Sequence, residues 1–513
     1  MGILLGATAH AANVSSTWLG GSGNWSAAGN WTNVPFTVNY PNNGNGGFTY
    51  DAVINSSSIT LDRSITIQKL TLSGGDLGGS SNLTCNDLIT WIGGGMAGTG
   101  TTVATGGVLI NPGGGSVTLY RTLCIAGTSA LTNGYVDTWG VLTNQTGAIF
   151  DIQDDSSFLD GGPDHGAFVN VGTLRKSGAG NNISGQGVGV SAFDDFVRLE
   201  NSGTVQIDVG TLKLICYTQT AGITKLSGGA IASSNPLTIE GGCFAGTGTV
   251  SATVMNNGTI SPGFPTGRLD INGSVTLQAG SHLAIELGGY TQGPGYDFVN
   301  VNGKVALGGE LRVSFTNNFE GVATNGASFT VLTASTPFSG SFANVTNGGT
   351  LFTIEGLARV TVQYSGSSVV LSDLQMIAVV DDGIPVWWRS AFFGGNGQTT
   401  NSQSCAICDP DGDGRNNLHE YLSGTDPTNS TSAFRITEII PEDEDVLITW
   451  TTVEGKWYVL QTTTDSNANY GDDFVDLNPA IVGRNPGESI ISVVHLGGAT
   501  NASARFYRVR ILP

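Results

Sequence analysis

The sequence is poor in charged residues, and above all in basic ones. Charged side chains make up 12% of the 513 residues, against a usual share of about 25%. Lys and Arg together number 20 and Asp and Glu 40, so the formal net charge at pH 7 is −20. Nucleic acids and anionic membranes bind proteins through basic patches, so this acidic balance argues against both as partners.

Long apolar runs are also missing beyond the N-terminus. After residue 12 there is no run of about 18 apolar residues, so no membrane-spanning helix is expected. Residues 2–12 resemble the end of a secretory signal, with Ala9-His10-Ala11 as a small-x-small cleavage site, although no basic segment precedes them. The other interpretation is an apolar N-terminus without fixed structure. The signal interpretation makes residues 1–12 a signal-peptide remnant and predicts secretion.

Common catalytic motifs are absent too. The five histidines are scattered, and there is no His-Glu-x-x-His, no Gly-x-Ser-x-Gly and no phosphate-binding loop. The best acidic cluster is followed by two basic residues: Asp151, Asp154, Asp155, Asp160, Asp164 and His165, then Arg175 and Lys176. On a β-helix this set could act as a polysaccharide lyase, with carboxylates holding calcium and Arg or Lys abstracting a proton. The other interpretation is an acidic loop whose basic neighbours face solvent, and we assign no catalytic residue.

Cysteines are few, and only two are close in sequence. The six lie at positions 85, 124, 216, 243, 405 and 408. No second Cys-x-x-Cys or His pair completes Cys405-Ala-Ile-Cys408 as a zinc site, so zinc is not expected. In an oxidising compartment Cys405 and Cys408 could form a local disulfide. Simple burial is the expectation for the other four.

A short acidic stretch is the most specific chemical signal in the chain. Carboxylates at positions 1, 3 and 5, glycine at 6, asparagine at 9 and glutamate at 12 are found in the run Asp409-Pro410-Asp411-Gly412-Asp413-Gly414-Arg415-Asn416-Asn417-Leu418-His419-Glu420. A hard cation such as Ca²⁺ requires this oxygen ligand set, in which position 7 contributes only its carbonyl. An ordinary acidic turn gives no reason for the asparagine and the glutamate. We therefore predict Ca²⁺ ligands at Asp409, Asp411, Asp413, Arg415, Asn417 and Glu420.

The residues after this loop carry a resemblance. The tail Gly424-Thr425-Asp426-Pro427 makes the region from Asp409 to Pro427 resemble a bacterial thrombospondin type 3 repeat more than a complete EF-hand. The resemblance implies that calcium has a structural role and adds Asp426 as a candidate ligand. Position 8, usually apolar in paired EF-hands, is Asn416. We therefore expect no opening switch of the EF-hand sensor type.

Three tryptophans stand near the start of the chain. Trp18, Trp25 and Trp31 are separated by Gly and Asn turns, and this opening resembles the Trp-rich start of large repetitive surface proteins of environmental bacteria. Flat indole rings can stack on sugars. They can also cover the exposed end of a stack of strands, and this second interpretation is the one we favour.

Between residues 55 and 371 one pattern repeats, a short β-rich run followed by Gly or Asn. Examples are 65–72, 203–208, 210–214 and 274–277. Alternation places Ile, Val and Leu on one face of each run and Thr, Ser and Lys on the other. Such runs, recurring at intervals of about 20 residues without helices between them, predict a parallel β-solenoid.

Two segments of this region carry a second resemblance. Residues 169–214 and 263–345 resemble autotransporter-passenger repeats in periodicity and glycine placement, as in Leu-Gly-Gly-Glu-Leu-Arg-Val at 307–313. The resemblance implies a right-handed parallel β-helix. An autotransporter also needs a C-terminal membrane barrel of many strands, for which the residues after 433 are too few. We therefore expect the passenger fold without self-transport.

The repeating β-rich pattern ends near residue 373. Residues 381–389 (Asp-Asp-Gly-Ile-Pro-Val-Trp-Trp-Arg) resemble the opening Asp-Gly-Ile-Pro-Asp-Trp-Trp that often precedes such calcium repeats, with Val386 in place of an aspartate. Asp381 and Asp382 are candidate additional ligands. The aromatic residues that follow have helical spacing and predict a small core packed on the calcium loop: Trp387, Trp388, Phe392 and Phe393.

The last segment predicts a β-sandwich. Alternating strands at 446–450, 457–461, 490–495 and 505–511 are separated by Gly, Asn and Pro turns. The ending Arg505-Phe506-Tyr507-Arg508-Val509 resembles the immunoglobulin or fibronectin-like modules that accompany such calcium repeats.

Together these features predict an all-β protein: a right-handed parallel β-solenoid, a short calcium-binding connector and a small β-sandwich. The expected boundaries are 13–372 for the solenoid with its Trp-rich cap, 373–432 for the connector and 433–513 for the sandwich. The expected function is that of a secreted, calcium-binding, non-enzymatic structural or adhesive protein of the cell surface or extracellular matrix. Its expected partners are extracellular polysaccharide or cell-surface components. The alternative is a β-helix protein that binds or cleaves polysaccharide.

Overall fold

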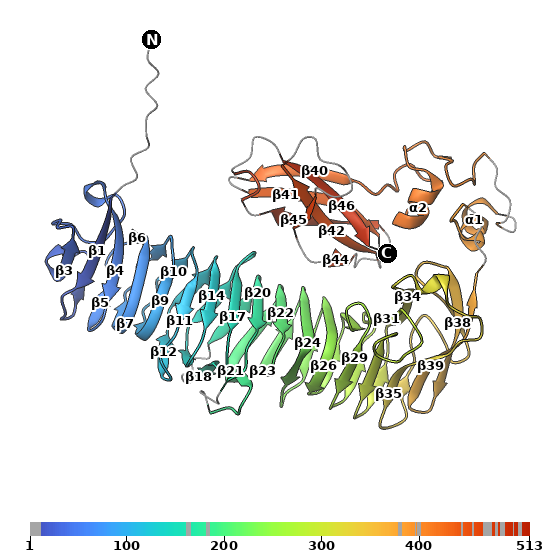
Figure 1. Ribbon diagram of the computed structural model, residues 1–513, viewed down its shortest axis with the longest axis horizontal. Coiled ribbons are helices and arrows are strands. Elements are labelled where there is room, and N and C mark those ends of the chain that lie inside the picture. Colours follow the sequence, from blue (N-terminus) through green and yellow to red (C-terminus); the bar gives the residue numbers. More distant parts are fainter. Residues whose placement is uncertain are drawn as a thin grey trace, which may run out of the picture.

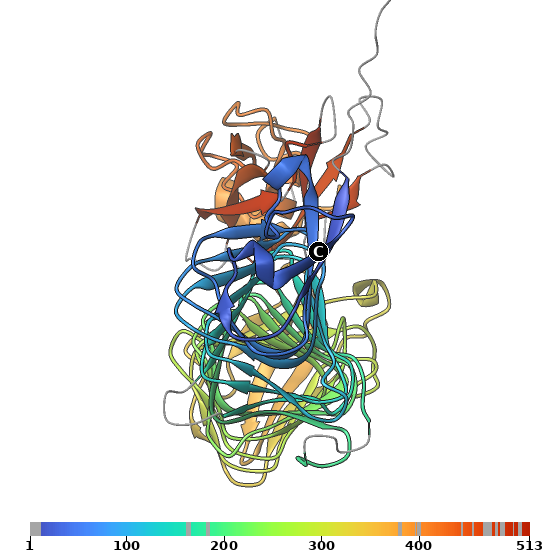
Figure 2. The ribbon, with the colours of Figure 1, turned by 90° about the vertical axis from the view of Figure 1, so that its left-hand side faces the viewer.

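A computed structural model describes the chain at residues 12–160, 166–180, 185–377, 382–394, 397, 402–442, 445–453, 456–464, 474–477, 481–482, 488–495, 497–500 and 505–512. These residues form a long β-stranded shaft, and the C-terminal strands and two helices lie along one side of it rather than beyond its end (Figures 1 and 2). The N-terminal residues that resemble a secretory signal lie outside the described residues, apart from Ala12.

The shaft is a parallel β-solenoid, as the alternating pattern predicts. One of its sheets is built from strands of successive turns, each paired in parallel with the next. These strands are β6 (Ile65–Ile67), β8 (Leu83–Cys85), β10 (Thr101–Ala104), β13 (Thr122–Ile125), β16 (Val141–Asn144), β19 (Ala167–Asn170), β21 (Val190–Asn201), β23 (Thr211–Gln219), β25 (Leu237–Ile239), β27 (Val254–Asn256), β30 (Val275–Leu277), β33 (Val305–Leu307) and β36 (Ser339–Gly340).

The interior of the shaft is one continuous apolar core, because every second residue of each strand points inward. It includes a stack of rings in which Phe158 lies 4.9 Å from Phe193 and 5.3 Å from Phe168. It also includes a buried polar ladder. Asn144 Nδ2 donates to Asn170 Oδ1 at 2.8 Å, and Asn170 Nδ2 donates to Asn201 Oδ1 at 2.8 Å. Each amide thus satisfies the next, which avoids the cost of burying a polar group without a partner.

The tryptophans close the N-terminal end of the shaft. Strand β1 (Asn13–Trp18) pairs in parallel with β4 (Thr49–Ile54) and antiparallel with β3 (Trp31–Val34), which ends the stack. Trp18, Trp25 and Trp31 are buried, and the Trp31 ring lies 5.0 Å from Trp18 and 4.8 Å from Trp25. The structure thus confirms the cap, since rings packed against each other in this way present no stacking surface to a sugar.

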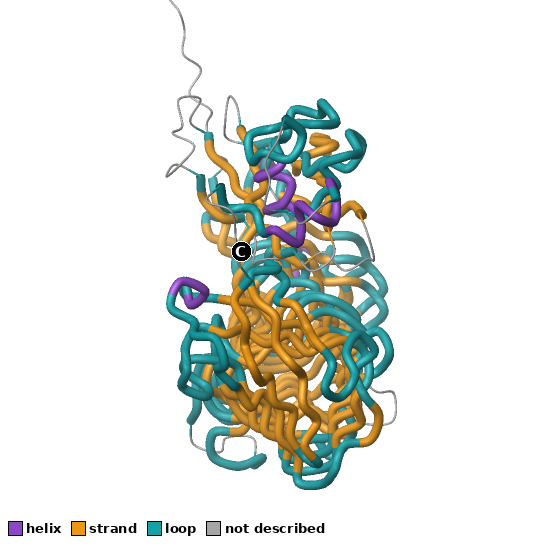
Figure 3. Tube along the Cα trace, turned by 90° about the vertical axis from the view of Figure 1, so that its right-hand side faces the viewer, coloured by secondary structure: helices purple, strands orange, loops and turns teal. Residues whose placement is uncertain are grey.

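The C-terminal end of the shaft is closed by antiparallel strands. Strand β35 (Phe329–Ala334) pairs with β39 (Ser368–Met376), which pairs with β38 (Ala358–Ser365), and β38 pairs with β37 (Thr350–Phe352). A turn at 353–356 joins β37 to β38, and Gly356 N donates there to Thr353 O at 2.8 Å. Figure 3 looks onto this end of the shaft, with the two helices above it.

After the shaft come two short helices, α1 (Val386–Phe393) and α2 (Asn417–Ser423), and then two antiparallel sheets. One sheet contains β40 (Ile436–Glu442), β41 (Asp445–Val453) and β45 (Glu488–His495). The other contains β42 (Trp457–Thr463), β43 (Val475–Asp476), β44 (Ile481–Val482) and β46 (Phe506–Leu512). They share a core around Ile448, Trp450, Tyr458 and Leu460, and so form a small sandwich. No helix in the described parts of the chain is long and apolar enough to span a membrane.

Candidate metal centre

The acidic loop is held at both of its ends. Cys405 and Cys408 form a disulfide directly before it. At the other end, Asn416 caps helix α2, because its side-chain oxygen accepts from His419 N at 2.9 Å. Asn417 N donates to Cys408 O at 2.8 Å and closes the loop onto the disulfide. A stretch rich in glycine and aspartate therefore has a defined path.

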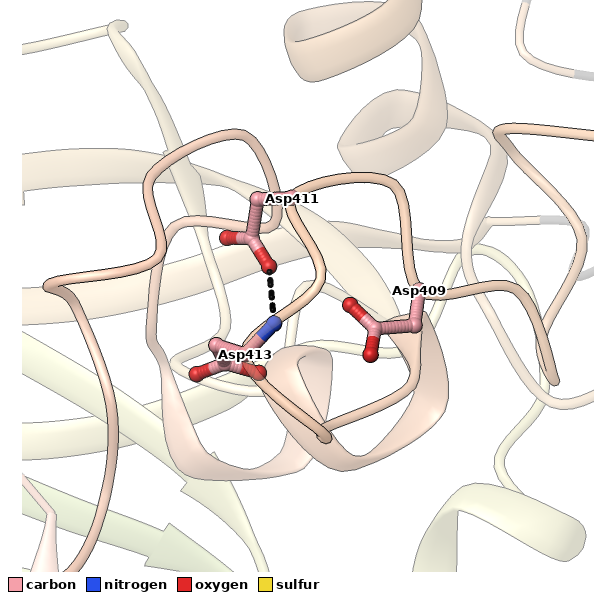
Figure 4. A group of neighbouring side chains, drawn as sticks. All are labelled: Asp409, Asp411 and Asp413. Carbon is pink, nitrogen blue, oxygen red and sulfur yellow. Dashed lines mark hydrogen bonds between the residues drawn. The ribbon is translucent and has the colours of Figure 1, made fainter.

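Three aspartates converge inside this loop (Figure 4). Carboxylate oxygens of Asp409, Asp411 and Asp413 lie within 4.8 Å of one another. One oxygen of Asp411 accepts from Asp413 N at 3.2 Å, and one oxygen of Asp413 accepts from Arg415 N at 2.7 Å. Gly412 and Gly414 have φ values of 78° and 91°, which other residues rarely adopt, and this is why the chain can turn so tightly here.

Both oxygens of Asp409 accept from backbone amides, Gly412 N at 2.8 Å and Gly414 N at 2.9 Å. One oxygen each of Asp411 and Asp413 has no hydrogen-bond partner among the described residues. Asp411 Oδ2 and Asp413 Oδ2 are buried and accept no hydrogen bond. Buried carboxylate oxygens without donors are costly, since the charged group has lost its water. Burial, followed by the charges of Asp413 and Asp409, raises the pKa of Asp411.

Glu420 is a fourth carboxyl group near the site: the charges of the three aspartates act on it, although it is not part of the group whose oxygens lie within 4.8 Å of one another. It lies in the first turn of α2 and is fully buried, and neither of its side-chain oxygens meets a donor in the described part of the chain. Burial is the main cause that raises the pKa of Glu420 to about 8, and the charges of Asp411, Asp413 and Asp409 raise it further. A buried glutamate that is close to the negative charge of three aspartates, and whose oxygens accept no hydrogen bond, is stabilised by a bound divalent cation.

The remaining predicted ligands are Asn417, Asp426 and the Arg415 carbonyl, and they lie outside the group of converging carboxylates. Asn417 is fully buried, and its Nδ2 donates to Gln403 O at 2.6 Å and Cys405 O at 2.8 Å, so the side chain also braces the disulfide segment. Within the described residues its Oδ1 accepts no hydrogen bond. Asp426 adds to the negative charge that raises the pKa of Glu420, but one of its oxygens already accepts from Thr428 N at 2.9 Å. The ligand roles of Asn417, Asp426 and the Arg415 carbonyl stay predictions, as do those of the four carboxylates described above.

The aromatic residues of the connector form a small core, with one exception. Trp388 of α1 is buried, and its ring lies 4.9 Å from Phe392 and 6.1 Å from Tyr421 of α2. Trp387 instead points the other way and is 38% exposed. Its indole Nε1 donates to Gly356 O of the shaft at 2.7 Å. Helical spacing alone could not separate these neighbouring residues, because the shaft partner is distant in sequence.

Asp382, a candidate additional calcium ligand from the sequence, instead pairs with an arginine. Arg389 is buried, and its Nη2 donates to both carboxylate oxygens of Asp382 at 2.5 Å. A guanidinium therefore already neutralises this carboxylate, which is a reason not to count Asp382 among the calcium ligands. Asp381 lies outside the described residues.

The acidic cluster of the shaft does not converge on one point. Arg175 points outward and pairs with Asp208 at 2.6 Å, whereas its neighbour Lys176 points inward and donates to Asp154 O at 2.9 Å. Asp155 is buried and accepts from Gly180 N and Gly189 N, each at 2.8 Å. These side chains hold a loop of the solenoid. Asp164 and His165, and the side chain of Asp160, lie outside what is described.

The predicted cysteine chemistry is partly confirmed. Cys405 and Cys408 form the local disulfide that the sequence left open. Cys85 and Cys243 are buried, but Cys124 and Cys216 are only half-buried, because they occupy strand positions near the solenoid surface. Burial of a thiol among apolar groups disfavours its charged form, and it raises the pKa of Cys85 to about 12.

The geometry thus offers a compact, oxygen-only, strongly negative site next to a disulfide. Such a donor set suits a hard divalent cation of the calcium type and not zinc, which prefers sulfur and nitrogen ligands. The chain matches no protein-family model, no curated protein and no solved structure.

Proposed function

We propose that this chain is a secreted, non-enzymatic structural or adhesive protein of the cell surface or extracellular matrix, in which Ca²⁺ orders the connector between a β-solenoid shaft and a C-terminal sandwich. One observation supports this above all. Glu420 is completely buried beside three converging aspartates and, among the described residues, has no hydrogen-bond donor. A bound cation gives these oxygens the partners that the protein itself does not supply.

Three further features fit an extracellular setting. The disulfide between Cys405 and Cys408 is stable in oxidising compartments. Calcium is abundant outside cells, and modules there bind it with dissociation constants of about 10⁻⁴ to 10⁻³ M. The resemblance of residues 2–12 to a secretory signal, and of 409–427 to a thrombospondin type 3 repeat, agrees with this location.

The proposal is tested with the full-length protein. Isothermal titration with CaCl₂ up to about 10 mM should show binding in the range given above. Thermal unfolding should show a transition of the C-terminal part that moves to higher temperature with calcium and back with a chelator, because a ligand of the folded state stabilises it. The Glu420→Gln variant keeps the size of the side chain and should lose both effects.

A matched control is Glu310→Gln, which changes a half-buried glutamate of the shaft strand β34 (Glu310–Phe315) that pairs with Arg312 of the same strand. It should bind calcium as the wild type does. If the wild-type protein shows no heat of binding and no calcium-dependent transition at any concentration, the loop is a solvated acidic turn and the proposal fails.

We do not extend the proposal to cleavage of polysaccharide. Arg175 and Lys176, the only basic residues of the lyase-like set, lie on opposite sides of β20 (Thr173–Lys176). Binding of polysaccharide or of other cell-surface components remains a prediction from the sequence.

A further inference from the structure

The turn at residues 353–356, called the cap turn from here on, is where three parts of the chain meet. It belongs to the C-terminal cap of the shaft. Both helices of the connector donate a hydrogen bond to it, α1 through Trp387 and α2 through Tyr421. The charge of Lys456, just before the sandwich strand β42, acts on Glu355 of the turn. None of these contacts was expected from sequence.

The cap turn is fixed firmly to the shaft. Ile354 N donates to Val313 O of β34 at 2.8 Å, and Phe315 N of the same strand donates to Glu355 Oε1 at 3.1 Å. Thr353 N donates to Ala358 O at 3.0 Å and completes the turn. Whatever is bound to this turn is therefore held in a fixed relation to the solenoid.

Helix α1 is seated on the cap turn. The Trp387 indole donates to Gly356 O, and its ring lies directly over the glycine. A β-carbon at position 356 would lie about 2.1 Å from the indole nitrogen, and the φ of 67° there also disfavours any other residue. Glycine is thus the only residue type at position 356 that allows the Trp387 ring to approach the backbone so closely.

Helix α2 is seated on the same turn one residue away. The Tyr421 hydroxyl donates to Glu355 O. Tyr421 directly follows Glu420, which closes the calcium loop. The contact with the shaft and the candidate metal ligand are therefore adjacent residues of one short helix, and neither can move far without the other.

The sandwich reaches the same place through Lys456. Burial raises the pKa of Glu355 to about 7, and the nearby Lys456 ammonium opposes that rise. A β-carbon at Gly424, which ends α2, would lie 3.3 Å from Lys456 Cε. Lys456 therefore lies close to the end of α2.

We propose that the cap turn is the docking surface through which calcium binding fixes the connector and the sandwich against the shaft. Without the cation, the three converging aspartates repel one another and the buried Glu420 side chain has no partner among the described residues, so the loop and the first turn of α2 lose their common centre. Tyr421 then loses its fixed position over Glu355, and the C-terminal part is released from the shaft. With the cation, the same contacts hold the C-terminal part alongside the shaft, as in Figure 1. This inference rests on the calcium site proposed above.

The test combines binding with shape, on the full-length protein. Small-angle X-ray scattering reports the maximum dimension of the molecule, and is recorded with about 5 mM CaCl₂ and with chelator. This calcium concentration is about five times the weakest expected dissociation constant. Titration calorimetry on the same samples reports binding. The wild type should become more compact with calcium, and the backbone amides of α2 should exchange with deuterium about tenfold more slowly.

The decisive variant combines Tyr421→Phe with Trp387→Phe, which removes both hydrogen bonds to the cap turn while keeping an aromatic ring at each position. It should bind calcium with an affinity within about threefold of the wild type, a difference of less than 1 kcal/mol, and show no compaction. The control is Leu422→Ala, on an exposed position of the same helix. It should behave as the wild type. Hydrogen exchange of the shaft strands confirms that each variant is folded.

The outcomes separate the two proposals. If the wild type binds calcium but its maximum dimension is the same with and without calcium, the docking inference is overturned and the proposed metal site stands. Compaction of the double variant equal to that of the wild type overturns the assignment to the cap turn. If the wild type binds no calcium, the proposed function fails and the docking inference fails with it.

Discussion

The shaft and the connector solve the same problem in opposite ways. In the shaft, each strand hydrogen-bonds to the next turn, and its inward side chains pack on those above and below. Part of its polar interior is satisfied from within, because the side chains of Asn144, Asn170 and Asn201 are joined by hydrogen bonds, although Asn144 Oδ1 accepts none from the described residues. The connector has two short helices and a core of only a few apolar residues. Its acidic side chains point toward one another and leave oxygens that no described donor meets.

This difference teaches where a ligand can control the molecule. A repetitive core spreads its stability over many similar interfaces, so no single site governs it. A small segment with little apolar burial depends on each of its cross-links, here a disulfide and the candidate cation. We therefore expect calcium to act on the connector and on what the connector holds, and to leave the shaft unchanged.

The largest effect should come from a change inside the shaft. Phe158→Ala empties the centre of the ring stack formed with Phe150, Phe168 and Phe193. Its cost should be about 3–5 kcal/mol of unfolding free energy, with no dependence on calcium. Urea unfolding followed by far-UV circular dichroism, with and without chelator, measures both. The control is Ile149→Ala, on an outward and partly exposed position of β17 (Ile149–Ile152), which should cost far less. A calcium-dependent loss in Phe158→Ala would show that the two regions are not separate.

A smaller effect is expected where the shaft approaches the connector. Burial, and then the negative charge of Glu355, raises the pKa of Glu286 on β31 (His282–Leu287) to about 7. The folded state therefore holds a proton that the unfolded chain releases near pH 4.5. Stability should fall as the pH rises from about 4.5 to about 7 and stay lower above that, by about 2–3 kcal/mol.

Glu286→Gln removes this titration. The variant should equal the wild type below pH 4.5 and exceed it at pH 8, as measured by urea unfolding at a series of pH values. Glu240→Gln, on an exposed position directly after the shaft strand β25, should leave the pH profile of the wild type intact. If Glu286→Gln follows the wild type at every pH, the carboxyl of Glu286 is already ionised in the folded protein.

The smallest effect should come from the cap of α2. Asn416→Ala removes the side-chain oxygen that accepts from His419 N and should cost about 1 kcal/mol of helix stability. Because α2 carries Glu420, the loss should appear as a severalfold weaker calcium affinity in calorimetry, with the shaft unaffected. Asn416→Ser retains a capping oxygen and should restore most of the affinity. Equal affinities in all three proteins would separate the cap from the metal site.

Much of this architecture could be predicted from local patterns. Period-2 alternation and glycine spacing predicted the parallel solenoid, because each turn of a solenoid repeats the same burial requirement. The sandwich and the burial of the N-terminal tryptophans followed from equally local signals. The aspartate spacing predicted the convergence of Asp409, Asp411 and Asp413, because these residues are only two positions apart and one loop places them.

Contacts between distant segments could not be predicted in this way. Arg389 neutralises Asp382, and Trp387 leaves the connector core for Gly356 of the shaft. The lyase-like set separates because Arg175 and Lys176 alternate across a strand whose neighbours come from other turns.

The sequence by itself therefore determined the repeating unit, its inward face and the loop that gathers carboxylates, since each depends on residues close together in the chain. Only the tertiary structure decided that Glu420 is fully buried, that the connector is seated on the cap turn, and that the sandwich lies along the shaft. These features depend on which surfaces meet after folding. Hydrogen bonds between such surfaces join residues far apart in the chain, such as Tyr421 and Glu355, which are 66 positions apart, and no local pattern records them.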